Sequence, residues 1–170
     1  EIISYLRSSG FLENTLIIFT SDNGPVLNDG YQDGAEEVAA GHDPRGGTRG
    51  GKYSLYDGGT HVPLIVYWKG VVKPVVSEAI VCQLDFFASL VELIGGDVPY
   101  ESIDSRNHIK AFLGRSKVGR KSLIHEAQGK FSYRSGNFAL IPPYKGARRN
   151  VTRNELGNLP EWSLFNLEED

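Results

Sequence analysis

Apolar side chains occur in two unbroken runs of strand length in the first half of the chain. Residues 16–20 read LIIFT, and residues 64–68 read LIVYW directly after Pro63. An unbroken apolar run is typical of a central strand in a parallel sheet that is covered on both faces. The pattern therefore predicts two buried strands in this half of the chain.

Apolar residues at helical spacing precede the first of these strands and follow the second. Residues 1–9 have the pattern of an amphipathic helix that ends at Gly10, and Asp85 stands where it can cap a helix that runs to Ile94. Strands and helices then alternate along the chain. This order predicts an α/β fold with a doubly wound sheet.

The second half of the chain has a different pattern, with short alternating strands separated by turn residues. The predicted strands are residues 122–126, 131–134, 138–141 and 163–167. Short strands joined by tight turns favour antiparallel pairing. We therefore expect two domains, an α/β core over residues 1–115 and a small antiparallel β subdomain over residues 116–170.

Composition narrows the function classes. The 18 basic and 21 acidic residues are scattered and leave a net charge of −3, so nucleic acid is not an expected partner. The apolar runs are far shorter than the ~20 residues of a membrane span. Cys82 is the single cysteine, Met is absent, and the first residue lies inside a helical pattern. These features predict that the chain is part of a longer protein.

The segment between the two apolar strands is rich in Gly, Asp and Asn and has no sustained periodicity. Its length of ~30 residues exceeds that of an ordinary loop, which favours a functional one. Asp22 and Asn23 begin it at the carboxyl end of the first strand, where α/β sheets bind ligands. Their side chains offer hard oxygen ligands for Ca²⁺ or Mg²⁺. Taken alone, the Asp-Asn-Gly sequence also fits a plain turn.

A second motif closes this loop, where residues 49–63 read RGGKYSLYDGGTHVP. The spacing from Gly46 to Lys52 fits a phosphate-binding P-loop, but Tyr53 replaces the required Ser or Thr and no strand leads in, so we exclude a nucleotide site. A lysine among glycines can neutralise the oxygens of an anion that the backbone approaches closely. A solvated surface lysine is the alternative that this motif alone leaves open.

The two motifs together are similar to the C-terminal half of the catalytic core of type I sulfatases, which are arylsulfatase-like members of the alkaline phosphatase superfamily. The shared pattern is a strand ending in SDNGP, a variable loop and the RGGKYSLYDGGTHVP segment. The resemblance continues at residues 83–90 (QLDFFASL), 138–143 (FALIPP) and 163–167 (SLFNL). It covers nearly the whole chain.

This resemblance implies an alkaline-phosphatase-like fold and hydrolysis of sulfate esters with a bound Ca²⁺, or alternatively Mg²⁺. The family pattern places metal ligands at Asp22 and Asn23 and a sulfate-contacting catalytic lysine at Lys52. The family's nucleophile is a formylglycine hydrate made from Cys or Ser, and the cation and the lysine offset charge on the transferring group.

The chain also departs from the family pattern. No segment matches the nucleophile motif, so we expect the formylglycine and the remaining metal ligands to lie outside this chain, which would then be inactive alone. His61 replaces a common arginine and is interpreted as a packed histidine. His42 lies on the loop between the two motifs and is a candidate substrate contact. The sequon at Asn150 is a short match only.

Two alternatives remain open. One is a phosphomonoester or phosphonate hydrolase of the same superfamily, and the other is a catalytically inactive binding homologue. The expected partners are a sulfated small molecule or glycan and the N-terminal half of the same enzyme. The family resemblance implies a periplasmic, secreted or lysosomal location.

Overall fold

The structure is a computed structural model that describes residues 1–26 and 28–170. The chain divides into two compact units. Unit 1 consists of Glu1–Phe19 and Ile65–Lys121, and unit 2 consists of Thr20–Leu64 and Ser122–Asp170. No helix in the described residues is long and apolar enough to cross a membrane. The boundary expected between residues 115 and 116 stays a prediction.

Unit 1 contains the predicted helices and the two apolar strands. Its elements in chain order are α1 (Ile2–Ser8), the 3₁₀ helix η1 (Leu12–Asn14), β1 (Ile17–Thr20), β2 (Leu64–Tyr67), α3 (Asp85–Leu93) and α4 (Ile109–Phe112). The last residue of β1 and the first of β2 belong to unit 2. The chain leaves α1 through Gly10, whose φ of 76° is a left-handed conformation that favours glycine.

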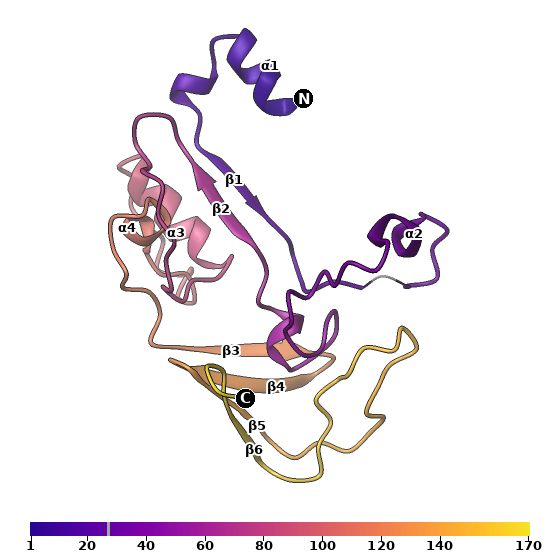
Figure 1. The fold of residues 1–170 in the computed structure, drawn as a ribbon. Helices are drawn as coiled ribbons and strands as arrows, with labels where there is room; N and C mark the ends of the chain where they lie inside the picture. The colour runs from indigo at the N-terminus through magenta and orange to yellow at the C-terminus, as the bar shows by residue number, and fades with distance from the viewer. Residues whose placement is uncertain (27) are drawn as a thin grey trace. The chain divides into compact units, whose positions relative to one another are not determined.

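The apolar strands β1 and β2 differ in two ways from the expectation of buried parallel strands. They are hydrogen-bonded neighbours, and their arrows point in opposite directions in Figure 1. Phe19 is 63% exposed and Ile65 is 59% exposed. An unbroken apolar run shows that both faces of a strand are apolar, but it carries no information on the direction of the neighbouring strand.

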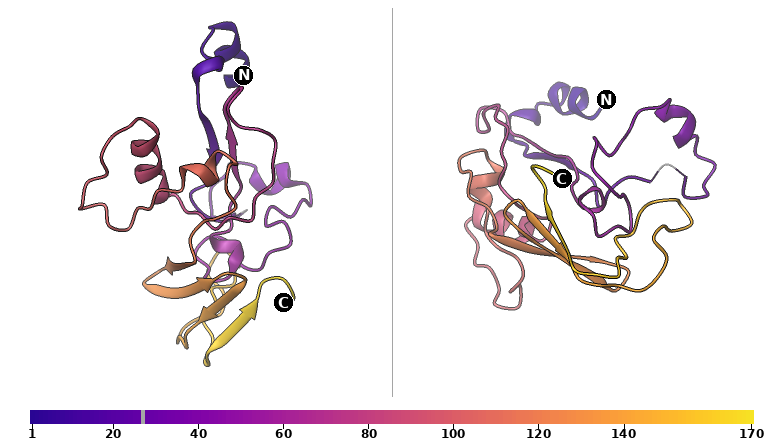
Figure 2. Two further views of the ribbon diagram at one scale, coloured as in Figure 1. Left: turned by 90° about the vertical axis from the view of Figure 1, so that its left-hand side faces the viewer. Right: turned by 60° about the horizontal axis from the view of Figure 1, so that its bottom comes forward.

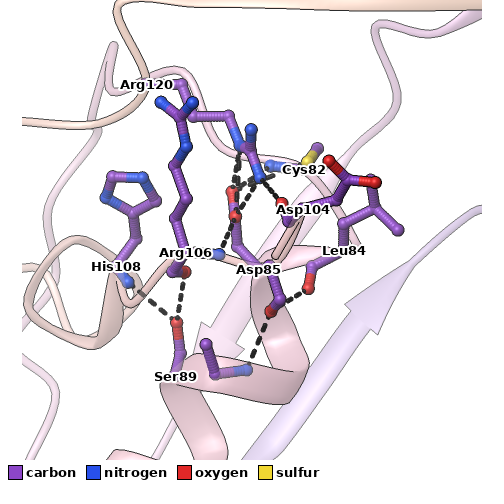
Figure 3. Close-up of polar contacts among 10 residues, drawn as sticks. Cys82, Leu84, Asp85, Ser89, Asp104, Arg106, His108 and Arg120 are labelled. Carbon is purple, nitrogen blue, oxygen red and sulfur yellow. Dashed lines mark hydrogen bonds and ion pairs between the residues drawn. The ribbon is translucent and has the colours of Figure 1, made fainter. Parts of the chain in front are cut away.

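The sequence predicted that Asp85 caps α3, and this prediction is wrong because the side chain has a different role. Residue Leu84 holds the cap position without a side-chain cap bond. The fully buried Asp85 carboxylate instead pairs with Arg120 at 2.6 Å, and it accepts hydrogen bonds from the backbone N–H groups of Cys82 and Arg106 at 3.1 and 3.0 Å (Figure 3). The two ends of the 82–120 segment are therefore tied at one buried ion pair.

The electrostatics of Asp85 follow from these contacts. Burial alone would raise the pKa of its carboxyl group, but the hydrogen bonds from Arg120 and the two backbone N–H groups outweigh burial and hold the pKa below its ordinary value. The Cys82 thiol lies 3.5 Å from this carboxylate, and burial together with the nearby negative charge raises the thiol pKa. A thiol held in its protonated form is a poor nucleophile, in agreement with the absence of a catalytic cysteine motif.

Unit 2 contains the antiparallel sheet that the second half of the sequence predicted. Its strands are β3 (Ser122–Ala127), β4 (Lys130–Ser135), β5 (Phe138–Ile141) and β6 (Ser163–Asn166), in the order β3-β4-β5-β6 (Figures 1 and 2). Every neighbouring pair is antiparallel. The small antiparallel sheet is therefore confirmed, with strand ends within one residue of the predicted ones.

Unit 2 also contains the long loop, which carries two short helices that its irregular pattern did not predict. These are α2 (Ala35–Ala39) and the 3₁₀ helix η2 (Asp57–Gly59). The loop is anchored to the sheet by a small core in which Leu55 and Tyr56 pack with Ile141. The Tyr56 ring meets Phe165 of β6 edge-on at 5.7 Å. The lysine motif is thereby held on the antiparallel sheet by the residues that follow Lys52.

Candidate functional site

The proposed metal ligands lie where the sequence predicted them, directly after β1. Asp22 is exposed and Asn23 is half-buried. The Asn23 amide nitrogen donates a hydrogen bond to the carbonyl oxygen of Gly24 at 2.9 Å. This bond fixes the orientation of the amide, so the oxygen of the side chain is the atom that remains suited to a cation.

Gly24 packs against η2 so closely that no larger residue fits. Its backbone N–H donates to the Gly59 carbonyl oxygen at 2.8 Å. A Cβ atom at this position would lie 1.8 Å from the carbonyl oxygen of Gly58. The glycine after Asn23 is therefore required by this close approach of two backbones, and the approach brings the Asp22-Asn23 segment onto η2.

Lys52 lies beside the same segment. Its backbone N–H donates to the carbonyl oxygen of Pro25 at 3.0 Å, and its ammonium group lies 5.5 Å from the centre of the Tyr53 ring. Tyr53 has a φ of 73°, a left-handed conformation that is uncommon for a bulky residue. Such strain persists only where surrounding contacts impose it, and here it occurs next to the proposed catalytic lysine.

A residue that the sequence analysis did not single out joins these two segments. The side-chain amide of Asn154 donates to the carbonyl oxygens of Pro25 at 3.4 Å and Lys52 at 3.3 Å. The backbone N–H of Asn154 donates to the side chain of Asn150 at 2.9 Å, which holds the turn that presents it. No local pattern marks Asn154, because its partners lie more than 100 residues away in the chain.

The two motifs meet at an open pocket of about 310 Å³, which Asn23, Lys52, Arg45, Thr48 and His61 help to line. This volume is at the lower end of the range for small-molecule sites. Arg45 is paired with Asp43 at 2.8 Å. The structure thus brings a proposed metal ligand and the proposed sulfate-binding lysine to one pocket.

Two of the predicted residues, Asp22 and His42, are not among the described residues that line this pocket. Asp22 directly precedes Asn23 and is open to solvent. His42 is exposed on the turn after α2, where its backbone N–H donates to Ala39 at 2.7 Å. Its role as a substrate contact stays a prediction.

His61 is not the packed histidine that the sequence suggested. Its side chain is 61% exposed, and Nδ1 lies 2.7 Å from Oδ2 of Asp57. The other oxygen of Asp57 accepts a hydrogen bond from Arg134 of β4 at 2.9 Å. The Asp-to-His spacing of four residues was visible in the sequence, but the pairing with Arg134 was not, because 77 residues separate the partners.

The protonation states of Asp57 and His125 follow from burial and from neighbouring groups. Burial alone would raise the pKa of Asp57, but the hydrogen bond from His61 and the positive charge of Arg134 lower it below the ordinary value. His125 of β3 hydrogen-bonds with Thr60 at 3.1 Å, and burial lowers the pKa of its imidazole. Asp57 is therefore ionised and His125 neutral at neutral pH.

The donor set fits part of a calcium site. Asp22 and Asn23 supply two hard oxygens, whereas Ca²⁺ takes six to eight. No cluster of three or more His, Cys, Asp or Glu side chains that could hold a metal ion is found among residues 1–26 and 28–170. A cation bound here would need further ligands besides those of the described residues.

The asparagine of the sequon is held in a turn. The Asn150 side-chain oxygen accepts hydrogen bonds from Thr152 and from the Asn154 backbone, and its amide nitrogen is buried without a hydrogen-bond partner in the described structure. A buried amide nitrogen leaves no room for an attached sugar. The geometry therefore argues against glycosylation of Asn150 in the folded chain.

Comparisons with known proteins give the family. Residues 1–96 match the family described as Sulfatase. Over its whole length the chain is 40% identical to N-acetylgalactosamine-6-O-sulfatase of Bacteroides thetaiotaomicron and covers 34% of that protein. Over 81% of its length it is 32% identical to human Arylsulfatase A and covers 26% of it. The chain thus spans about a third or less of these relatives.

A solved structure gives the fold. It comes from work on the metabolism of multiple glycosaminoglycans by Bacteroides thetaiotaomicron, is 39% identical and superposes with a TM-score of 0.92 over 99% of the chain. The chain covers 36% of that structure. The predicted α/β fold of the alkaline-phosphatase type is confirmed, and the match over residues 1–96 shows that the chain belongs to the sulfatase family.

Proposed function

We propose that this chain is the C-terminal portion of a sulfatase that hydrolyses the sulfate ester of a glycan. The observation that carries the proposal is the meeting of Asn23 and Lys52 at one pocket, held by the hydrogen bond between the Lys52 N–H and Pro25. Family membership adds the class of reaction. The name of the Bacteroides relative supports a sulfated amino sugar as the first substrate class to test.

In the proposed site Asp22 and Asn23 hold a Ca²⁺ ion, with Mg²⁺ as the alternative. The cation would supply Lewis acidity at the sulfate oxygens, and a formylglycine outside this chain would supply the nucleophile. Lys52 contributes a fixed positive charge next to the transferring sulfate. Because charge grows on the sulfate and leaving oxygens as the ester bond breaks, Lys52 stabilises the transition state more than the bound substrate.

The remaining expectations belong to the same proposal. His42 could reach a substrate larger than the pocket from its exposed turn. The partner is the N-terminal half of the enzyme, which would supply the other metal ligands. The family resemblance supports a periplasmic, secreted or lysosomal compartment.

The test is steady-state hydrolysis by the intact protein that carries this chain. The substrates are phenyl sulfate, phenyl phosphate, and the 6-sulfates of N-acetylgalactosamine, N-acetylglucosamine and galactose. We expect sulfate esters to be hydrolysed faster than phenyl phosphate. A preference for the phosphate would favour a phosphomonoester hydrolase, and binding without turnover would favour an inactive homologue.

The Lys52→Ala variant then assigns the lysine. We expect kcat to fall by about a hundredfold or more, equivalent to about 3 kcal/mol, as when one preorganised charge-stabilising donor is removed. Lys52→Arg should not restore the rate, because a planar guanidinium cannot replace a compact ammonium. The matched control is Lys117→Ala, which removes an exposed cation that does not line the pocket. A raised KM with kcat intact would reduce Lys52 to a binding residue.

A further inference from the structure

His61 occupies a position in the pocket that packing does not explain. It follows η2, lines the pocket together with Asn23 and Lys52, and keeps 61% of its side chain exposed. A histidine whose only role is packing would bury its ring against apolar neighbours. The ring of His61 instead forms part of the pocket surface.

Asp57 holds this imidazole in place. The Asp57 side chain is 15% exposed, and its two oxygens are divided between His61 Nδ1 at 2.7 Å and Arg134 at 2.9 Å. A carboxylate on Nδ1 selects the tautomer or ion that carries a proton there and restricts rotation of the ring. Arg134 belongs to β4, so the position of the imidazole ring is fixed by the sheet as well as by the loop.

The same element also positions the metal motif. Gly59 of η2 accepts the hydrogen bond from Gly24, directly after Asn23, and the His61 N–H donates to the Asp57 carbonyl oxygen at 2.8 Å. The placement of His61 relative to Asn23 is therefore set by η2. A side chain fixed in this way loses little conformational entropy when it binds a ligand.

We propose that His61 is a specificity-determining residue whose imidazole forms a hydrogen bond with a hydroxyl group of the sugar, away from the sulfate ester that is cleaved. Asp57 and Arg134 act as its positioning residues. The inference rests on the proposed function, since it assigns the sugar portion of the same substrate to His61. The ligand chemistry is a hydroxyl group of the sugar ring, which can donate to the neutral imidazole and can accept from the imidazolium ion.

A comparison of two substrates tests this assignment. Phenyl sulfate has no oxygen outside the ester, whereas the sugar 6-sulfates have several. For His61→Ala in the intact protein we expect KM for the best sugar sulfate to rise about tenfold, with kcat for that sugar and both constants for phenyl sulfate within about twofold of wild type. A tenfold change corresponds to about 1.4 kcal/mol.

Two further variants separate specificity from folding. His61→Gln keeps a polar group that can both donate and accept a hydrogen bond, so it should recover part of the sugar affinity. Asp57→Asn keeps one oxygen acceptor, which can serve either His61 or Arg134, so it should loosen the imidazole without removing it and raise the sugar KM less than His61→Ala does. Lys117→Ala is the control, and thermal melting of each variant checks the fold.

The Kd of the same sugar sulfate, measured by calorimetry, tests the role of His61 independently of turnover. A tenfold weaker Kd for His61→Ala supports it even in a protein that hydrolyses neither substrate, a result that would overturn the proposed function alone. Equal losses on phenyl sulfate and on the sugar, or an unchanged Kd and KM for the sugar, would overturn the role of His61. Loss of both activities in Lys52→Ala with sugar binding still sensitive to His61 supports both assignments.

Discussion

The Lys52 backbone N–H donates a hydrogen bond to the carbonyl oxygen of Pro25 at 3.0 Å. Together with the bond from Gly24 to Gly59, this bond joins the two sequence motifs across the long loop. Asn154 strengthens the junction from the C-terminal part of unit 2 by donating to the carbonyl groups of Pro25 and Lys52. The relative position of the proposed metal ligands and the proposed lysine therefore depends on backbone contacts, to which the Asn154 side chain adds.

The metal assignment predicts the behaviour of Asp22→Ala in the intact protein. Loss of the one anionic ligand that this motif supplies should reduce Ca²⁺ affinity and sulfate ester hydrolysis together. Metal content measured by atomic absorption and Ca²⁺ titration by calorimetry give a readout that is independent of activity. Asp97→Ala, which removes an exposed carboxylate in unit 1, is the control. Unchanged metal content in Asp22→Ala would refute the assignment.

The close backbone contact at Gly24 predicts that Gly24→Ala damages the site without removing any functional group. The new methyl would meet the Gly58 carbonyl oxygen at 1.8 Å, which forces η2 and the Asn23 segment apart. Overpacking of this kind costs about 1–3 kcal/mol, so urea unfolding should show lower stability along with weaker Ca²⁺ binding.

Gly96→Ala is the matched control for this change. Gly96 also lacks a positive φ, but the nearest atom to its added methyl would be a Val91 side-chain atom at 3.2 Å. We expect a smaller loss of stability and unchanged Ca²⁺ affinity. Equal effects of the two substitutions would show that the contact between Gly24 and Gly58 has no special part in positioning the site.

The buried Asp85 and Arg120 pair predicts a large stability loss for Asp85→Asn. Removing the negative charge leaves the Arg120 guanidinium buried without its partner, which typically costs about 3–5 kcal/mol. Chemical denaturation at neutral pH measures this cost. Asp97→Asn, at an exposed carboxylate, should leave the free energy of unfolding nearly unchanged.

The same pair predicts a dependence on pH. The pKa of Asp85 is lower in the folded chain than its ordinary value of 3.8, so its stabilising contribution is present above that value. The contribution is lost as the pH falls below 3.8 and through the folded-state pKa. Wild type should therefore lose more stability than Asp85→Asn on acidification from pH 6 to pH 3. Parallel losses in the two proteins would contradict this role.

The exposed strands predict the behaviour of the 170-residue chain expressed alone. Phe19 and Ile65 of β1 and β2 are largely exposed, as is Ile2 of α1. Apolar surface of this kind binds hydrophobic dyes and promotes association. We expect dye fluorescence and a broad size distribution in light scattering. A cooperative melt of a monomer with sharp side-chain NMR signals would contradict the proposal that further chain covers these strands.

Local patterns predicted the elements of this protein well. The unbroken apolar runs located β1 and β2, and the alternating residues near Gly136 located β4 and β5, because strand formation and turn chemistry depend on neighbours in the chain. The direction of β2 and the exposure of both apolar strands were not predictable, since they depend on which strands lie beside them. The helix cap expected at Asp85 failed for the same reason, as Arg120 competes for the carboxylate.

The sequence by itself determined the family, the places of Asp22, Asn23 and Lys52 after a strand and in a glycine-rich motif, and the small antiparallel sheet. Only the tertiary structure decided that Asn23, Lys52 and His61 share a pocket, and that Asp57 and Arg134 hold His61. The physical reason is distance along the chain. Residue type and spacing determine local conformation and the chemical groups that are available. Contacts across tens of residues form only when the loop closes on the sheet.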